Sequence, residues 1–207
     1  MSAARTDGEL RSSDELVEAL GRIPAANIGD AQDRLGVVTG LHPVWPGATL
    51  AGRARTVWTR SGDNLYIHRM LDEARPGDVI VVNGHGDLTR ALLGDLIGLR
   101  ARALGIAGFV IDGAIRDAQG LGELGMPVFA AGITPAGPYK HGPGRLDVPV
   151  AIGGVVVQPG DIVVGDSDGV VVVAAAEAEE VLERAQAVVQ READKRVELD
   201  ALGVVAM

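Results

Sequence analysis

The chain has 207 residues, 47% hydrophobic and 23% charged, which is ordinary globular usage and favours a single domain over residues 1–207 with a substantial core. Its net charge of −9 argues against nucleic acid or an anionic membrane as a partner and leaves a small anionic substrate open. The absence of cysteine excludes disulfides and thiolate sites, and without an apolar run of ~20 residues or a signal-peptide core we expect a cytoplasmic protein.

The first elements are helical and then extended. Ser12–Glu15 has the pattern of a helix capping box and is followed by apolar residues at helical spacing. A second short helix is predicted over Asn27–Leu35, ended by Gly36. A long strand over Leu50–Thr59 and a helix over Asn64–Ala74 come next.

One sequence pattern occurs twice. The run Arg75–Val82 closely resembles the run Gln158–Val164, and each has Pro-Gly at its start. Pro-Gly predicts a type II turn, here followed by a β-branched strand. Two copies are too few for a solenoid, so we interpret them as two similar turn–strand devices.

The middle of the chain alternates between strands and helices, which predicts a parallel α/β unit. The predicted elements are the strand Val79–Val82, the helix Asp95–Leu104, the strand Gly108–Ile111, the helix Ala118–Leu124 and the strand Pro127–Ala130. Short β runs between Val148 and Val173 predict an antiparallel region. An amphipathic helix is predicted over Glu177–Leu199, with an apolar face made of Val181, Leu182, Ala185, Val188 and Val189.

Three charged residues form the main candidate site. Asp95 opens one predicted helix, and Arg116-Asp117 follows a predicted strand and the turn residues Asp112-Gly113. The strand–helix unit brings them to one sheet edge, where they can bind an anion, hold a divalent metal and move a proton. Two plainer explanations stay open: Asp95 only favours the helix dipole, and Arg116-Asp117 is a solvated ion pair.

Other kinds of site are disfavoured. Gly120–Gly125 matches the dinucleotide fingerprint, but its glycines lie at a helix end rather than after a strand. The serines lack a nucleophile-elbow context, and neither lysine, Lys140 or Lys195, lies in an apolar run suited to an imine-forming amine. His85 follows a strand end and is a weak candidate for a supporting role.

At Asp95, Arg116 and Asp117 the chain resembles the metal-dependent 4-hydroxy-4-methyl-2-oxoglutarate aldolases, the RraA-like family that also contains the regulators of ribonuclease E activity. The resemblance rests on Asp95, a gap of twenty residues and then Arg116-Asp117. It extends from about Asn27 to the C-terminal helix through the segments Asp63-Asn64, Arg75–Val79, Gly105–Asp117, Met126–Phe129 and Val155–Val173.

The resemblance implies an α/β fold of the three-layer β/β/α swivelling-domain type, with mixed sheets and a C-terminal helix. It implies a homotrimer or a hexamer built as a dimer of trimers. The implied reaction is cleavage of 4-hydroxy-2-oxo acids to pyruvate, with oxaloacetate decarboxylation as a side or alternative activity. The implied partner is thus a small 2-oxo acid, not a nucleic acid or membrane.

The resemblance also implies a role for each site residue. Gly94, Asp95, Leu96 and Ile97 would contact the pyruvyl group, Arg116 its carboxylate and keto oxygen, and Asp117 the metal, Mg²⁺ or Mn²⁺. Cleavage forms a pyruvate enolate, which a metal and Arg116 can stabilise. Asp95, through a water, is then the candidate for proton transfer.

Two points stay open at this stage. An acid from the C-terminal helix of a neighbouring subunit can complete the metal's surroundings, and Glu192, Glu183 and Glu198 are the candidates. The alternative function is a non-catalytic regulator that binds a ribonuclease or another protein. The regulators are implied to lack the full acid–Arg–Asp set that this chain retains.

Overall fold

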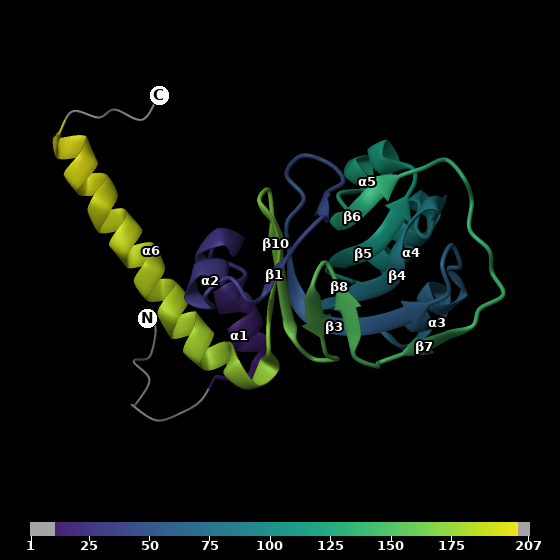
Figure 1. The fold of residues 1–207 in the computed structure, drawn as a ribbon, viewed down its shortest axis with the longest axis horizontal. Helices are drawn as coiled ribbons and strands as arrows, with labels where there is room; N and C mark the ends of the chain where they lie inside the picture. Colours follow the sequence, from purple (N-terminus) through teal and green to yellow (C-terminus); the bar gives the residue numbers. More distant parts are fainter. Residues whose placement is uncertain (1–10, 203–207) are drawn as a thin grey trace.

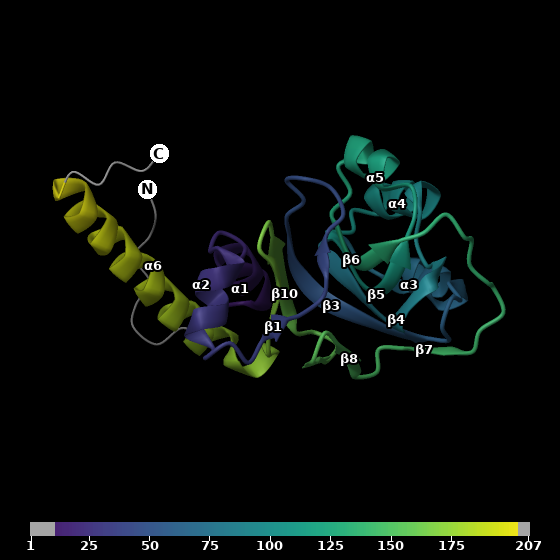
Figure 2. The same ribbon diagram turned by 45° about the horizontal axis from the view of Figure 1, so that its top comes forward.

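The computed structural model describes residues 11–202, which are built around one large mixed sheet (Figures 1 and 2). The strands are β1 (Val37–Val38), β2 (His42–Pro43), β3 (Leu50–Thr59), β4 (Asp78–Ala91), β5 (Gly108–Ile115), β6 (Val128–Ile133), β7 (Gly144–Leu146), β8 (Val150–Ile152), β9 (Val155–Val157), β10 (Ile162–Asp166) and β11 (Gly169–Val173). The helices are α1 (Ser13–Leu20), α2 (Ala25–Ala31), α3 (Leu65–Glu73), α4 (Asp95–Ala103), α5 (Ala118–Leu124), the 3₁₀ turn η1 (Ala175–Glu177) and α6 (Ala178–Ala201).

The sheet has a parallel centre and antiparallel flanks. Its order is β1-β11-β10-β3-β4-β5-β6-β2, with β7 paired to β3. Strands β3 to β6 run parallel, and the connections between them contain α3, α4 and α5, as parallel strands require. β10 and β11 pair antiparallel, and β8 and β9 form a separate hairpin. Both the predicted parallel unit and the predicted antiparallel region are confirmed.

The hydrophobic core lies on both faces of this sheet. Along β4, Ile80 and Val82 join a buried cluster with residues of α3, α4 and α5. The alternate residues Val79 and Val81 join a second cluster that includes the β8–β9 hairpin. Because successive side chains of a strand point to opposite faces, β4 serves both clusters. Hairpin, sheet and helices form the three layers of the expected β/β/α fold.

A third buried cluster joins α1, α2 and the first half of α6 to β10 and β11. The capping box at Ser12 and Glu15 is confirmed, and it starts α1. The predicted apolar face of α6 is buried except for Val189, which is 38% exposed. Residues 191–202 are all exposed, because α6 extends beyond the body of the protein (Figure 1). No helix among residues 11–202 is long and apolar enough to span a membrane.

The two Pro-Gly segments adopt the same structure. Gly77 and Gly160 have φ values of 84° and 93°, the left-handed conformation that a type II turn requires. In each copy the following aspartate accepts a hydrogen bond of 2.8 Å, from Arg75 N–H to Asp78 Oδ2 and from Gln158 N–H to Asp161 Oδ2. The repeated sequence therefore encodes a repeated turn and strand start, as predicted.

Several predicted element ends were wrong. The strand predicted over Val79–Val82 continues as β4 to Ala91, and the strand predicted over Pro127–Ala130 continues as β6 to Ile133. Asp112-Gly113 lies within β5 and is not a turn. A Cβ atom at Gly113 would lie 3.2 Å from Leu92 Cδ1, so the glycine permits close packing where the β4–β5 register shifts. The second helix ends at Ala31 rather than near Leu35, because Asp33 and Arg34 already take left-handed conformations.

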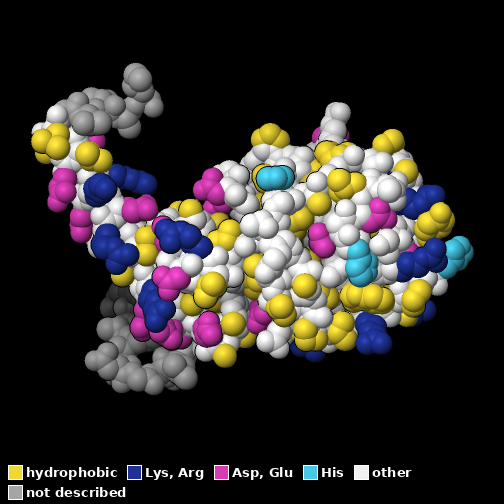
Figure 3. Space-filling view, viewed as in Figure 1, with side chains coloured by type: hydrophobic (Ala, Val, Ile, Leu, Met, Phe, Trp, Pro, Cys, Tyr) yellow, Lys and Arg dark blue, Asp and Glu magenta, His cyan; other side chains and the backbone are white. Residues whose placement is uncertain are grey.

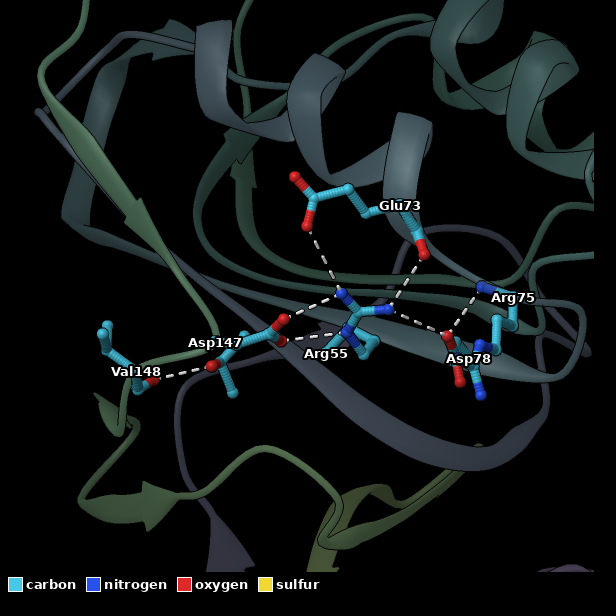
Figure 4. Close-up of polar contacts among 7 residues, drawn as sticks. Arg55, Glu73, Arg75, Asp78, Asp147 and Val148 are labelled. Atoms are coloured by element: carbon cyan, nitrogen blue, oxygen red, sulfur yellow. Dashed lines mark hydrogen bonds and ion pairs between the residues drawn. The ribbon is translucent and has the colours of Figure 1, made fainter.

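An ion network at the start of β4 fixes the C-terminal end of α3. Figure 4 shows Arg55 of β3 between Asp147, Glu73 and Asp78. Arg55 donates from Nε and Nη2 to the two Asp147 carboxylate oxygens (2.9 and 2.8 Å) and from Nη1 to the Glu73 carbonyl (3.2 Å). The hydrogen bond to Asp147 raises the pKa of Arg55. With its C-terminal end fixed at the start of β4, α3 has its N-terminal end near the carboxyl end of β4, where the candidate site lies.

Candidate functional site

The candidate site lies where α4 and α5 follow the carboxyl ends of β4 and β5. Leu92 N–H donates to the Ala114 carbonyl (2.8 Å), and Arg116 N–H donates to the Leu93 carbonyl (2.9 Å). These bonds hold the end of β5 beside the segment that leads into α4. They bring Gly94 and Asp95 next to Arg116 and Asp117, although some twenty residues separate the two pairs in sequence.

The Asp117 carboxylate lies at the N-terminus of α4. Its Oδ2 atom is 3.2 Å from Arg116 Nε and accepts a long hydrogen bond of 3.4 Å from Asp95 N–H. A Cβ atom at Gly94 would lie 2.5 Å from Oδ2, so a larger residue there would displace the carboxylate from this position. Cation, helix N-terminus and acid are therefore in direct contact.

Asp117 itself has an unusual backbone conformation. Its φ and ψ angles are 56° and 39°, in the left-handed region, which aspartate tolerates better than most residues. Asp117 occupies the N-cap position of α5, yet its side chain makes no capping hydrogen bond there. The carboxylate is instead directed to Arg116 and α4, away from an ordinary structural role, which favours a functional one.

A pocket of about 150 Å³ opens beside this contact. Its lining residues are Asn64, His68, Ala91, Leu93, Gly94, Leu96, Ile97, Arg116, Pro138 and Lys140. Of the predicted site residues, Gly94, Leu96, Ile97 and Arg116 thus line it. Asp95 and Asp117 do not line it. Asp117 is next to the pocket, because its carboxylate contacts the lining residue Arg116. Asp95 packs close to α5, since a Cβ atom at Gly120 would lie 3.2 Å from Asp95 Cβ.

Asp63 does not line the pocket, but it joins two of the segments that do. It is fully buried, and its carboxylate accepts hydrogen bonds from Leu65 N–H (2.9 Å), His141 N–H (2.7 Å) and Gly142 N–H (2.8 Å). Burial alone would raise the pKa of Asp63, but these three donors together hold the pKa below its ordinary value. The carboxylate thereby ties the start of α3 to the segment that carries Lys140.

The Asp117 carboxylate suits a divalent cation that keeps much of its hydration shell. Among residues 11–202 no group of three or more His, Asp or Glu side chains is placed to hold a metal ion. Mg²⁺ is commonly bound by only one or two carboxylates, with waters and substrate oxygens completing its shell. Asp117 is 38% exposed and next to a pocket, so it offers one such carboxylate with room for water.

The disfavoured sites are also accounted for structurally. Gly125, the last glycine of the dinucleotide-like run, ends α5 in a left-handed conformation (φ 65°), so the run terminates a helix as predicted. His85 contacts the Thr59 carbonyl (3.0 Å) and packs nearly perpendicular to the Trp58 ring, and it does not line the pocket. Lys140 is exposed, the opposite of the desolvated setting that an imine-forming lysine needs.

Three polar pocket residues were not assigned to the site from the sequence: Asn64, His68 and Lys140. Asp63-Asn64 stood out only as part of the family resemblance. The other sequence signal at Asn64 was that a predicted helix starts there. The start of a helix does not indicate which edge of the sheet the helix lies against.

Comparisons with known proteins agree with this architecture. The family model described as RraA-like, Aldolase/RraA, matches residues 25–172. A Halalkalibacterium halodurans protein named "Putative 4-hydroxy-4-methyl-2-oxoglutarate aldolase" is 46% identical over 165 residues, 79% of each chain. Streptomyces coelicolor RraAS2, described as an unusual member of the RNase ES inhibitor RraA protein family, has a TM-score of 0.82 and 35% identity, covering 91% of this chain and 99% of that one. An uncharacterized Pseudomonas syringae protein has a TM-score of 0.81 and 31% identity, covering 93% and 94%.

Proposed function

Because this chain belongs to the RraA-like, Aldolase/RraA family, we propose that it is a divalent-metal-dependent lyase that cleaves 4-hydroxy-4-methyl-2-oxoglutarate or a related 4-hydroxy-2-oxo acid to pyruvate. Oxaloacetate decarboxylation is its second activity. The observation that carries the proposal is the contact of Asp117 Oδ2 with both Arg116 Nε (3.2 Å) and Asp95 N–H (3.4 Å) beside a pocket.

Both reactions require the same stabilisation. In the cleavage, the C4 hydroxyl loses its proton and the electron pair of the C3–C4 bond moves toward the C2 carbonyl oxygen. The products are a second oxo acid and the enolate of pyruvate, which then takes a proton at C3. In the decarboxylation the same enolate forms as CO₂ leaves. A site that stabilises negative charge on the C2 oxygen therefore serves either substrate.

The residues of the site divide this work. Arg116 lines the pocket and presents a guanidinium that can donate to both the carboxylate and the keto oxygen of the pyruvyl group. The N–H groups at the start of α4 lie beside it and favour the same anion. Asp95, acting through a water, moves the proton.

Asp117 would hold the cation, Mg²⁺ or Mn²⁺, with water completing the shell. When bound, the ion supplies Lewis-acid polarisation of the 2-oxo group. The protein's part is to keep the Asp117 carboxylate in place, which Arg116, Asp95 N–H and the missing Cβ of Gly94 do.

A homotrimer, alone or doubled to a hexamer, is part of the proposal. The second half of α6 projects from the body and carries both charged and apolar side chains (Figure 3). Val197 in α6 and Leu202 just after it are 69% and 77% exposed, and in the proposed assembly another subunit covers them. Of the acids on this helix, Glu192 is 3.7 Å from Arg196, and Glu192, Glu183 and Glu198 remain the candidates to approach a neighbour's site.

The regulator alternative is favoured by the likeness to RraAS2. One assay separates the two functions. The purified protein is incubated with 4-hydroxy-4-methyl-2-oxoglutarate or oxaloacetate, with Mg²⁺ or with a chelator, and pyruvate is followed. We expect pyruvate with Mg²⁺ and none above the blank with chelator. No metal-dependent pyruvate from either substrate would exclude the lyase and leave the regulator.

A further inference from the structure

One buried polar atom of a residue that lines the pocket lacks a partner among residues 11–202. Asn64 is 3% exposed and lines the pocket, and its Oδ1 atom accepts no hydrogen bond from any described residue. The amide orientation is fixed, because Asn64 Nδ2 donates to the Leu92 carbonyl (3.1 Å), which can only accept. A buried acceptor left unpaired is destabilising, so a ligand that donates a hydrogen bond to it would be favoured.

The neighbouring groups indicate which part of a ligand reaches Asn64. Arg116 and the start of α4 take the pyruvyl carboxylate under the proposed function. Lys140 lines the pocket near Asn64, because Asp63 and the Asn64 N–H···Tyr139 carbonyl bond (3.1 Å) hold the two segments together. A second carboxylate would be attracted to Lys140. Of the three carbons between the two carboxylates, C3 and C4 would then pass Asn64.

His68 adds no competing charge. Burial lowers the pKa of His68, and the nearby cations Lys140 and Arg100 lower it further. The lowered pKa favours the neutral imidazole, so Lys140 is the cation on this side of the pocket. Asn64 Oδ1, as an acceptor, cannot bind a carboxylate and suits a hydroxyl.

We propose that Asn64 is a specificity residue whose Oδ1 atom accepts a hydrogen bond from the C4 hydroxyl of a 4-hydroxy-2-oxo acid. This rests on the proposed function and deepens it. Asn64 holds the hydroxyl in the orientation needed for cleavage, whereas oxaloacetate has no such hydroxyl and does not use it. Asn64 Oδ1 then binds the hydroxy acid and makes no hydrogen bond with oxaloacetate.

The test compares the two reactions in the same variants. Asn64→Ala removes the acceptor, and Asn64→Ser removes the amide but keeps a residue that is favoured at a helix N-cap, which protects the start of α3. We expect kcat/KM for the cleavage of 4-hydroxy-4-methyl-2-oxoglutarate to fall about 10- to 100-fold. We expect kcat/KM for oxaloacetate decarboxylation to stay within about threefold, with Mg²⁺ present in both assays.

Asn83→Ser is the matched control. Asn83 is satisfied at both amide atoms, by the Ala151 carbonyl (2.7 Å) and by His85 N–H (3.0 Å), and it does not line the pocket. We expect this variant to change neither reaction by more than about threefold, and thermal unfolding checks that all variants are folded.

The other outcomes contradict the inference in distinguishable ways. An equal fall of both reactions in the Asn64 variants, or no change in either, would overturn it and give Asn64 a structural role or a bound water. A wild-type protein that decarboxylates oxaloacetate but does not cleave the hydroxy acid would overturn it while leaving the decarboxylase. A wild-type protein that does neither would overturn both this inference and the proposed function.

Discussion

Replacing Asp117 with asparagine should lower metal-dependent pyruvate release about 10³-fold, or ~4 kcal/mol of transition-state stabilisation, and leave the protein folded. The change removes the negative charge proposed to hold the cation. It should spare the fold because the Asp117 side chain makes no cap bond to α5, and asparagine tolerates the left-handed conformation that Asp117 adopts. Initial rates at saturating Mg²⁺ and thermal unfolding measure the two parts.

Asp33→Asn provides the matched control, since Asp33 is also a left-handed aspartate (φ 52°) but lies outside the candidate pocket. It should retain full activity. Asp117→Ala should be as inactive as Asp117→Asn. Substantial activity in either Asp117 variant, with normal dependence on Mg²⁺, would show that Asp117 is not the metal ligand.

Asp63→Asn should produce the largest loss of stability, about 3 kcal/mol in the free energy of unfolding at pH 7. The carboxylate accepts three backbone N–H bonds in a fully buried position. In asparagine one oxygen becomes an NH₂ group that faces an N–H donor, so at least one bond is replaced by repulsion. Denaturant unfolding of the variant and the wild type gives the difference.

The pH dependence of that difference follows from the direction of the pKa shift. The folded-state pKa of Asp63 lies below the ordinary value of 3.8, so its stabilising contribution is complete above pH 3.8 and is lost as the pH falls through the folded-state pKa. The difference in the free energy of unfolding between wild type and Asp63→Asn should thus be constant near neutral pH and become smaller in acid.

Asp87→Asn is the comparison for this prediction. The Asp87 carboxylate also accepts two hydrogen bonds, from the N–H and hydroxyl of Thr89, which lower its pKa, but it does so in a half-buried position of β4. Asp87→Asn should lower the free energy of unfolding by less than about 1 kcal/mol. Equal losses for Asp63→Asn and Asp87→Asn would refute the role given to burial at Asp63.

Local pattern predicted the elements well where their signals were strong. β3 and α5 have the predicted bounds, Leu50–Thr59 and Ala118–Leu124, and the resemblance to the RraA-like family is confirmed. The Asp112-Gly113 turn was wrong because Asp-Gly is an ordinary turn signal. Here the glycine allows close packing against Leu92, which lies just after β4, and the local sequence does not reveal this contact.

The candidate site was predictable only in part, for a related reason. Asp95, Arg116 and Asp117 follow consecutive parallel strands, so a strand–helix rule brings them to one edge. The wall with Asn64 and Lys140 depends on tertiary bonds such as that from His141 N–H to Asp63, across 78 positions of the chain. No periodicity records such a bond. The roles of all these residues stay predictions.

The central claim is that this site stabilises the enolate of pyruvate, and the most direct measurement is exchange of the pyruvate methyl protons with solvent. Pyruvate is incubated with the protein in D₂O, and the methyl signal is followed by proton NMR. The account predicts deuterium incorporation with Mg²⁺, none above the blank with chelator, and none with Asp117→Asn. A folded wild-type protein that gives no exchange above the blank in the presence of Mg²⁺ or Mn²⁺ would contradict it.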